Sequence, residues 1–229
     1  LQELRVKESD RLAATLAMVF AMAQANAALP MMTMGLDFAP TLLFSVIGGL
    51  CAAAATYYLF GRKLSPQEGP LDETLHHRSA ESAKGVLDVI NHAGAEAFKI
   101  AVGAIPMLVL SLVAVTALKR FGVIDLLTQG LTPLLAAASI DPRIILPALT
   151  KYLAGGTAMM GVVDEMRRAG QMSVELLNAS AGFLIHPFDI PGVAVLISAD
   201  RRVAAVWKPA ALGACIGIAV RTLGHALTA

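Results

Sequence analysis

One apolar segment constrains this chain more than any other, because it is long enough to cross a membrane and carries a single charge. The segment runs from residue 144 to residue 163, and the charged residue is Lys151. A spanning helix needs about 20 apolar residues. An ammonium group at membrane depth costs at least about 2.5 kcal/mol on insertion scales. We therefore expect Lys151 to face a protein interior or a wet cavity; the alternative is a lysine that reaches back to the interface.

The composition also indicates a membrane protein. Hydrophobic residues make up 56% of the chain and charged residues 15%, whereas an ordinary soluble domain is about 25% charged. The net charge of +1, without a basic tract interleaved with aromatic residues, gives no indication of nucleic-acid binding. Cys51 and Cys215 lie in apolar segments and fit no metal or redox spacing, so we expect no metal site and no cofactor.

Apolar segments and flanking charges predict an all-α, polytopic transmembrane protein. Residues 12–29 and 40–60 form a first pair of spans, residues 97–118 a third span kinked at Pro106, and residues 204–227 the last. Basic residues flank the first pair on both sides, so both flanks are expected in the cytoplasm and the chain in the inner membrane. We therefore expect three parts: an N-terminal transmembrane hairpin (1–60), a cytoplasmic region (61–96) and a transmembrane domain (97–229).

The cytoplasmic region is expected to hold a loop and an amphipathic helix. The loop carries His76 and His77, which have no further ligands near them in sequence, so we interpret the pair as solvated rather than metal-binding. Charged residues then recur at spacings of three and four, which predicts a helix lying on the membrane surface or against a partner. These residues are Glu81, Lys84, Asp88, His92, Glu96 and Lys99.

Two kinds of helix break are expected in the C-terminal half. Pro147 and the pair Gly155-Gly156 bracket Lys151, so its helix should be kinked or interrupted. Residues 176–185 and 190–198 are each long enough for about half a bilayer. The prolines of the linker from His186 to Pro191 favour a re-entrant hairpin there. Val123 to Ser139, broken by Pro133, is expected to be interfacial or half-inserted.

The last span has small residues at a regular spacing. Gly213 and Gly217 form a small-xxx-small pattern, which predicts close packing against another helix, within the chain or across a dimer. Arg221 and His225 continue the same face. We interpret this face as a packing surface, with ligand contact by Arg221 or His225 as the alternative.

The part of the chain from about residue 102 to the C-terminus resembles a known family. Its motifs include Leu146-Pro147-Ala148-Leu149 and Ala154-Gly155-Gly156-Thr157, together with residues 105–110, 131–135 and 169–173. Their order is similar to that of the nucleoside-recognition (Gate) membrane domain, found in the spore maturation proteins A and B. The resemblance implies an inner-membrane protein with broken helices, linked to transport or small-solute recognition.

These observations predict a permease, or a permease subunit, for a small polar solute that is nucleoside-like or an ion. Its midplane site would lie between broken helices, and a contact between Lys151 and Asp189 is expected there because opposite charges lower each other's desolvation cost. The candidate site residues are Thr150, Lys151, Gly155, Gly156, Thr157, His186 and Asp189.

The alternative function is a non-transporting membrane interaction or assembly protein of the spore-maturation type. A homo- or hetero-oligomer with another membrane subunit is expected in either case. An enzyme is not expected, because His186 and Asp189 are not accompanied by a Ser, Cys or metal-ligand set of recognisable spacing.

Overall fold

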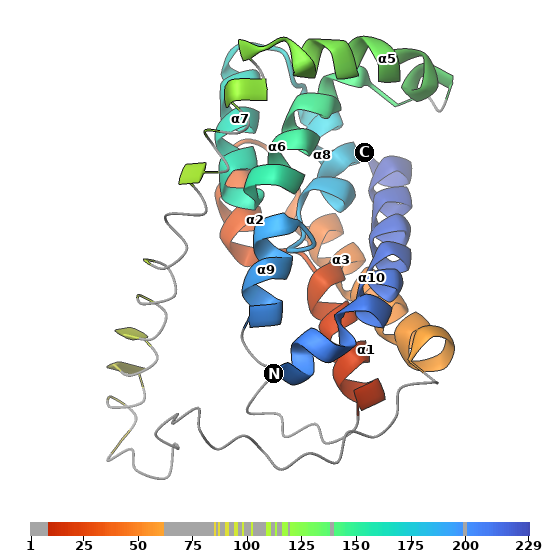
Figure 1. Ribbon diagram of the computed structural model, residues 1–229. Coiled ribbons are helices and arrows are strands. Elements are labelled where there is room, and N and C mark those ends of the chain that lie inside the picture. Colours follow the sequence, from red (N-terminus) through yellow and green to blue (C-terminus); the bar gives the residue numbers. More distant parts are fainter. Residues whose placement is uncertain are drawn as a thin grey trace.

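The computed structural model describes residues 9–61, 120–137, 140–198 and 201–229, together with scattered residues between 85 and 118. Every regular element in these parts is a helix, which confirms the all-α prediction (Figure 1). The loop with His76 and His77, all six charged residues of the amphipathic stripe, and Pro106 of the expected third span lie outside the described residues.

The described elements follow one another as helices of different lengths. They are α1 (Ser9–Ala21), α2 (Ala25–Met32), α3 (Phe38–Ala55), the π-helical turn η1 (Thr56–Phe60), α5 (Val123–Ala137), the 3-10 turn η3 (Pro142–Ile144), α6 (Ile145–Ala154), α7 (Gly156–Arg168), α8 (Val174–Leu184), α9 (Ile190–Ser198) and α10 (Arg201–Thr228).

Three helical stretches are long and apolar enough to cross a membrane. They are Ser9–Met32 with 24 residues, Phe38–Phe60 with 23 and Arg201–Thr228 with 28. A helix rises about 1.5 Å per residue, so each exceeds the thickness of about 30 Å of a hydrocarbon core. These stretches correspond to the first, second and last expected spans, and they are compatible with a membrane protein.

The described structure has three hydrophobic cores, and helix α10 links the two larger ones. One core joins residues of α1, such as Leu16 and Phe20, to residues of α10, such as Val206 and Ala214. A second core joins α2, α7 and α8 through residues that include Met31, Met159 and Leu177. Helix α10 also packs against α3 and α8, and α8 contributes to the second core, so α10 lies against both groups of helices (Figure 1).

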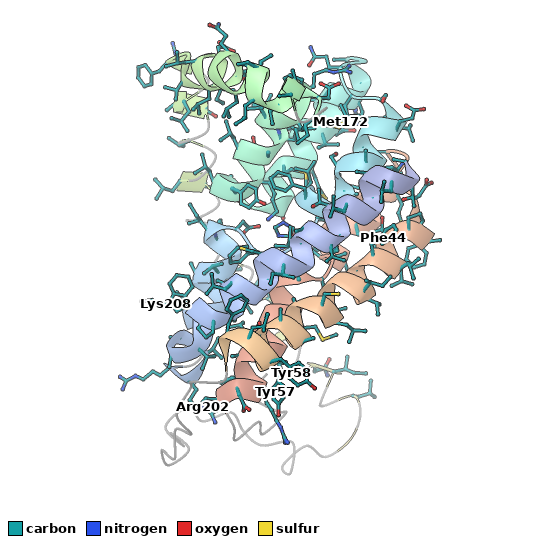
Figure 2. All side chains as sticks on the ribbon, turned by 90° about the vertical axis from the view of Figure 1, so that its right-hand side faces the viewer. Phe44, Tyr57, Tyr58, Met172, Arg202 and Lys208 are labelled. Atoms are coloured by element: carbon teal, nitrogen blue, oxygen red, sulfur yellow. The ribbon has the colours of Figure 1, made fainter. Side chains whose placement is uncertain are left out.

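Glycines set the distance between α10 and α3. A Cβ atom on Gly217 would collide with the backbone oxygen of Gly48, and one on Gly213 would collide with Thr56. Figure 2 shows the two helices side by side, with Phe44 near one end of α3 and Tyr57 near the other. The predicted packing role of Gly213 and Gly217 is confirmed, and the partner is α3 of the same chain.

The structure has a helical hairpin at α6–α7 and not at residues 186–191, where the sequence predicts one. Helices α6 and α7 pack side by side and are joined by Gly155 alone, whose φ of 86° is a left-handed conformation that favours glycine (Figure 1). The expected arms around residues 186–191 are α8 and α9, but α9 lies beyond α8 and packs against α6 and α10. Pro191 occupies the second position of α9, where proline is tolerated, so it begins a helix rather than reversing the chain.

Helix α5 crosses one end of the molecule above α6 and α7 (Figure 1). Its surface is apolar and open: Leu126 and Leu134 are exposed, and Ile124 is buried. The expected break at Pro133 is wrong, because α5 continues through this residue to Ala137. A proline inside a helix leaves the carbonyl four residues earlier without its hydrogen bond. Because α5 lies at the surface, that carbonyl can bond to other partners.

The turn before α6 is held by a surface ion pair. The Asp141 carboxylate accepts a hydrogen bond from the Arg143 backbone N–H at 2.9 Å and also pairs with the Arg143 guanidinium. Hydrogen bonding from Arg143 lowers the pKa of Asp141. Asp141 therefore caps η3 and fixes the point at which the chain enters α6.

We predict that replacing Gly213 and Gly217 together by leucine lowers the thermal stability of the purified protein. Overpacked positions typically cost about 1–3 kcal/mol each, and here the clash is with the backbone of α3. The measurement is the melting temperature in detergent, together with the oligomer size by light scattering.

The matched control is the replacement of Ala205 and Ala219 by leucine, because both residues lie on the exposed side of the same helix. The control should melt close to the wild type. Equal melting temperatures for the two double variants would contradict the glycine contact with α3.

Candidate functional site

Lys151 and Asp189 form a buried ion pair. The Lys151 Nζ lies 2.9 Å from Asp189 Oδ2, and the two side chains are 0% and 2% exposed. Lys151 is in the last turn of α6, and Asp189 immediately precedes α9. Nζ also donates to the Phe188 backbone oxygen at 3.3 Å. The predicted contact between Lys151 and Asp189 is therefore present, and it ties the α6–α7 hairpin to the α8–α9 break.

Asp189 uses its second oxygen to begin α9. Its Oδ1 accepts a hydrogen bond from the Gly192 backbone N–H at 2.7 Å, as the side chain of an N-cap residue does. A Cβ atom on Gly155 would lie 3.9 Å from this same Oδ1 and 3.7 Å from Pro191. The tip of the α6–α7 hairpin thus rests against the capped start of α9.

His186 is buried beside this ion pair and has one nitrogen in use. Its Nδ1 accepts a hydrogen bond from the Phe188 backbone N–H at 3.1 Å, whereas Nε2 has no partner among the described residues. Since Nδ1 acts as an acceptor, the neutral ring carries its proton on Nε2. The centroids of the His186 and Tyr152 rings are 6.0 Å apart. His186 Nε2 is therefore buried without a hydrogen-bond partner among the described residues.

A further break separates α1 from α2, and distant side chains satisfy its backbone. The Ala21 oxygen accepts a hydrogen bond from Arg221 Nη1 at 2.7 Å, and the Ala23 N–H donates to Ser45 Oγ at 2.8 Å. The Oε1 of Gln24 is buried against Gly156, at the start of α7, and has no hydrogen-bond partner among the described residues. The α1–α2 break therefore adjoins the tip of the α6–α7 hairpin.

Arg221 is completely buried and only partly satisfied. It fits between α3 and α8 because Gly48 and Gly182 leave space: a Cβ on Gly48 would collide with the Arg221 side chain, and one on Gly182 with its backbone. Among the described residues, its Nε and Nη2 have no hydrogen-bond partner and no carboxylate pairs with it. Arginine keeps its proton in proteins, so this helix carries a buried positive charge.

These groups form what we call the buried polar cluster: Gln24, Lys151, His186, Asp189, Arg221 and His225. Arg221 is bonded to Ala21 at the α1–α2 break, which adjoins the tip of the α6–α7 hairpin where Gln24 meets Gly156. With Lys151 and Arg221 positive, Asp189 negative and both histidines neutral, the cluster has an excess of one positive charge. Such an uncompensated charge favours an anion nearby.

The structure brings some of the sequence-predicted site residues together and separates others. Gly155 and Gly156 lie at the junction of the breaks. Thr150 is buried, but its hydroxyl donates to the Leu146 oxygen one turn earlier in α6 at 2.9 Å. Thr157 is exposed on the outer side of α7.

In the sequence, the spacing around Arg221 favours helix packing, with ligand contact as the alternative, and nothing marks Gln24 as a site residue. Arg221, like Lys151, is a charge within a long apolar segment, and such a charge is expected to face a protein interior or a cavity. For Gln24 the sequence gives no comparable signal, since its importance depends on Gly156, far away in the chain.

The fold and the cluster define a helical protein, compatible with a membrane protein, in which buried charges meet at helix breaks. Among the described residues there is no group of three or more His, Cys, Asp or Glu side chains that could hold a metal ion. Comparisons with protein-family models, curated proteins and solved structures gave no match.

We predict that Lys151 and Asp189 depend on one another for stability. Lys151→Met and Asp189→Asn alone should each destabilise the protein by about 3–5 kcal/mol, because each leaves one buried charge without its partner. The double variant should recover much of this loss, since asparagine can still accept the hydrogen bond from Gly192. Thermal melts of the wild type, the two single variants and the double variant give the coupling free energy between the two residues.

The matched control is the exposed ion pair between Asp164 and Arg168, one turn apart on α7. Asp164→Asn and Arg168→Met remove the same kinds of charge from the surface, where a pair is worth about 0–1 kcal/mol. Additive losses at Lys151 and Asp189, without recovery in the double variant, would show that the two charges do not stabilise one another.

Proposed function

We propose that this protein is an inner-membrane permease, or a permease subunit, for a small polar solute. The observation that carries the proposal is the buried Lys151–Asp189 ion pair at the junction of helix breaks. In this proposal the chain is polytopic, its helices are interrupted within the membrane, and α6–α7 is a re-entrant hairpin whose tip at Gly155 reaches the solute site.

The energetic cost of the pair supports this function. Replacing a buried ion pair by apolar residues is often neutral or stabilising, so stability alone gives little reason to keep Lys151 and Asp189. Transporters, in contrast, use interrupted helices to present charges and unsatisfied backbone groups to a solute. The unused polar atoms of His186, Gln24 and Arg221, next to this pair, are suited to such contacts.

The resemblance to the nucleoside-recognition domain extends the proposal to the kind of solute. It supports a nucleoside-like compound or an ion. It also supports an assembly with further copies of the chain or with another membrane subunit.

The alternative is a non-transporting assembly protein of the spore-maturation type. One observation favours it: the Lys151 and Asp189 side chains are 0% and 2% exposed, so the protein itself encloses the pair. In that case the breaks serve helix packing.

We predict that the protein reconstituted in liposomes takes up at least one of four labelled probes faster than empty liposomes do: uridine, adenosine, acetate or phosphate. The double variant Lys151→Met/Asp189→Asn should lower that rate at least about tenfold. It removes both charges of the site, and because no buried charge is left unpaired the protein stays folded. The measurement is initial uptake at equal amounts of reconstituted protein.

The control is the double variant Asp164→Asn/Arg168→Met, which removes the exposed pair and should transport as the wild type does. Wild-type flux that persists unchanged in Lys151→Met/Asp189→Asn would exclude the pair from the transport site. Absence of flux for all four probes would contradict the permease and favour the assembly protein.

A further inference from the structure

Arg221 has more hydrogen-bonding capacity than the protein around it uses. Its side chain is fully buried, Nη1 donates to the Ala21 oxygen at 2.7 Å, and Nε and Nη2 have no partner. A guanidinium group presents its N–H donors in a planar fork that fits two oxygens of a carboxylate or phosphate. The unused Nε and Nη2 of Arg221 therefore have the geometry needed to bind two oxygens of one oxyanion.

The surroundings of Arg221 favour an anion over a neutral or cationic ligand. Lys151 is the other buried cation of the part of the chain that the structure describes, and its charge is already balanced by Asp189 at 2.9 Å. His186 Nε2 is a further buried nitrogen without a hydrogen-bond partner among the described residues.

Two neighbouring groups require separate consideration. Gln24 Oε1 is a buried acceptor at the same junction, but a half-turn of its amide would present the N–H donors instead. His225, one turn after Arg221 in α10, also has an unpartnered Nε2. Neither group carries a negative charge that would compensate Arg221.

We propose that Arg221 is the anion-binding residue of this chain and that its ligand is a small oxyanion, a carboxylate or a phosphate group. The guanidinium would bind the oxyanion through Nε and Nη2 while Nη1 remains on the Ala21 oxygen, so that binding also holds the α1–α2 break. The inference rests on the proposed function in one respect, because the oxyanion would be part of the transported solute.

The test is thermal stabilisation of the purified full chain at constant ionic strength, with chloride replaced stepwise by acetate or inorganic phosphate. Acetamide, which has the shape of acetate without its charge, is the matched probe. We expect a saturable rise in melting temperature of about 5–10 °C at roughly a hundredfold excess over Kd for at least one oxyanion. Acetamide should produce no such rise.

The variants identify the residue. Arg221→Gln should abolish the rise, and Arg221→Lys, which keeps the charge but loses the fork, should weaken binding by about tenfold. Arg201→Gln is the matched control, because it removes an arginine from the exposed start of the same helix, and it should respond as the wild type does. If Arg221→Gln does not fold, the wild-type titration and Arg221→Lys still decide the result.

Several outcomes would overturn the proposal. They are no saturable rise in the wild type, an equal rise with acetamide, or an unchanged oxyanion response in Arg221→Lys and Arg221→Gln. Stabilisation by phosphatidylglycerol nanodiscs relative to phosphatidylcholine nanodiscs, without any effect of the soluble oxyanions, would assign Arg221 to a lipid headgroup and also overturn it.

The uptake measurement separates this proposal from the permease. Oxyanion binding without flux would retain the Arg221 site and reject transport. Flux of uridine without oxyanion stabilisation would retain transport and reject the Arg221 site.

Discussion

The arrangement of the described helices depends on compensation between buried charges and broken backbone. A helix that ends inside an apolar bundle leaves N–H and C=O groups without partners, and a buried charge loses its hydration. Here the buried charged side chains supply hydrogen bonds to the unpaired backbone groups at the helix breaks. Lys151 donates to the Phe188 oxygen, Asp189 accepts from Gly192, and Arg221 donates to the Ala21 oxygen. Each charged side chain therefore supplies a hydrogen bond that a break requires.

Small residues make this arrangement possible by letting the backbones approach one another. Gly48 and Gly182 leave the space that Arg221 occupies, and Gly217 brings α10 against the backbone of α3. A larger residue at these positions would collide with Arg221 or with the facing backbone and push α10 away from α3 or α8. The small-residue face and the charged residue on the same helix thus act together, although the sequence pattern favours packing over ligand contact.

Local signals in the sequence predicted the features that depend on composition and on nearby residues. The apolar stretches located the three long helices, the Gly213–Gly217 spacing indicated close packing, and the isolated charge of Lys151 indicated a buried partner. Asp189 could be named as that partner because it lies in a linker between two apolar segments. These inferences needed no knowledge of which helices are neighbours.

The features that depend on distant neighbours were predicted less well. The reversal of the chain was placed at residues 186–191 because of their prolines, yet Pro191 begins α9 and the reversal occurs at Gly155. A proline near a helix break fits either a turn or the first turn of the next helix. The choice between them depends on the contact of Asp189 with Lys151, 38 residues away.

The α1–α2 break shows the same limitation more clearly. Its backbone partners are Ser45 and Arg221, separated from it by 22 and 200 positions in the chain. Because Arg221 stabilises this break while two of its nitrogens stay unpaired, the residue joins a structural role to a capacity for binding. A ligand that engaged the free nitrogens would then act on the link between α10 and the α1–α2 break, which is how binding at a buried charge can be coupled to helix movement.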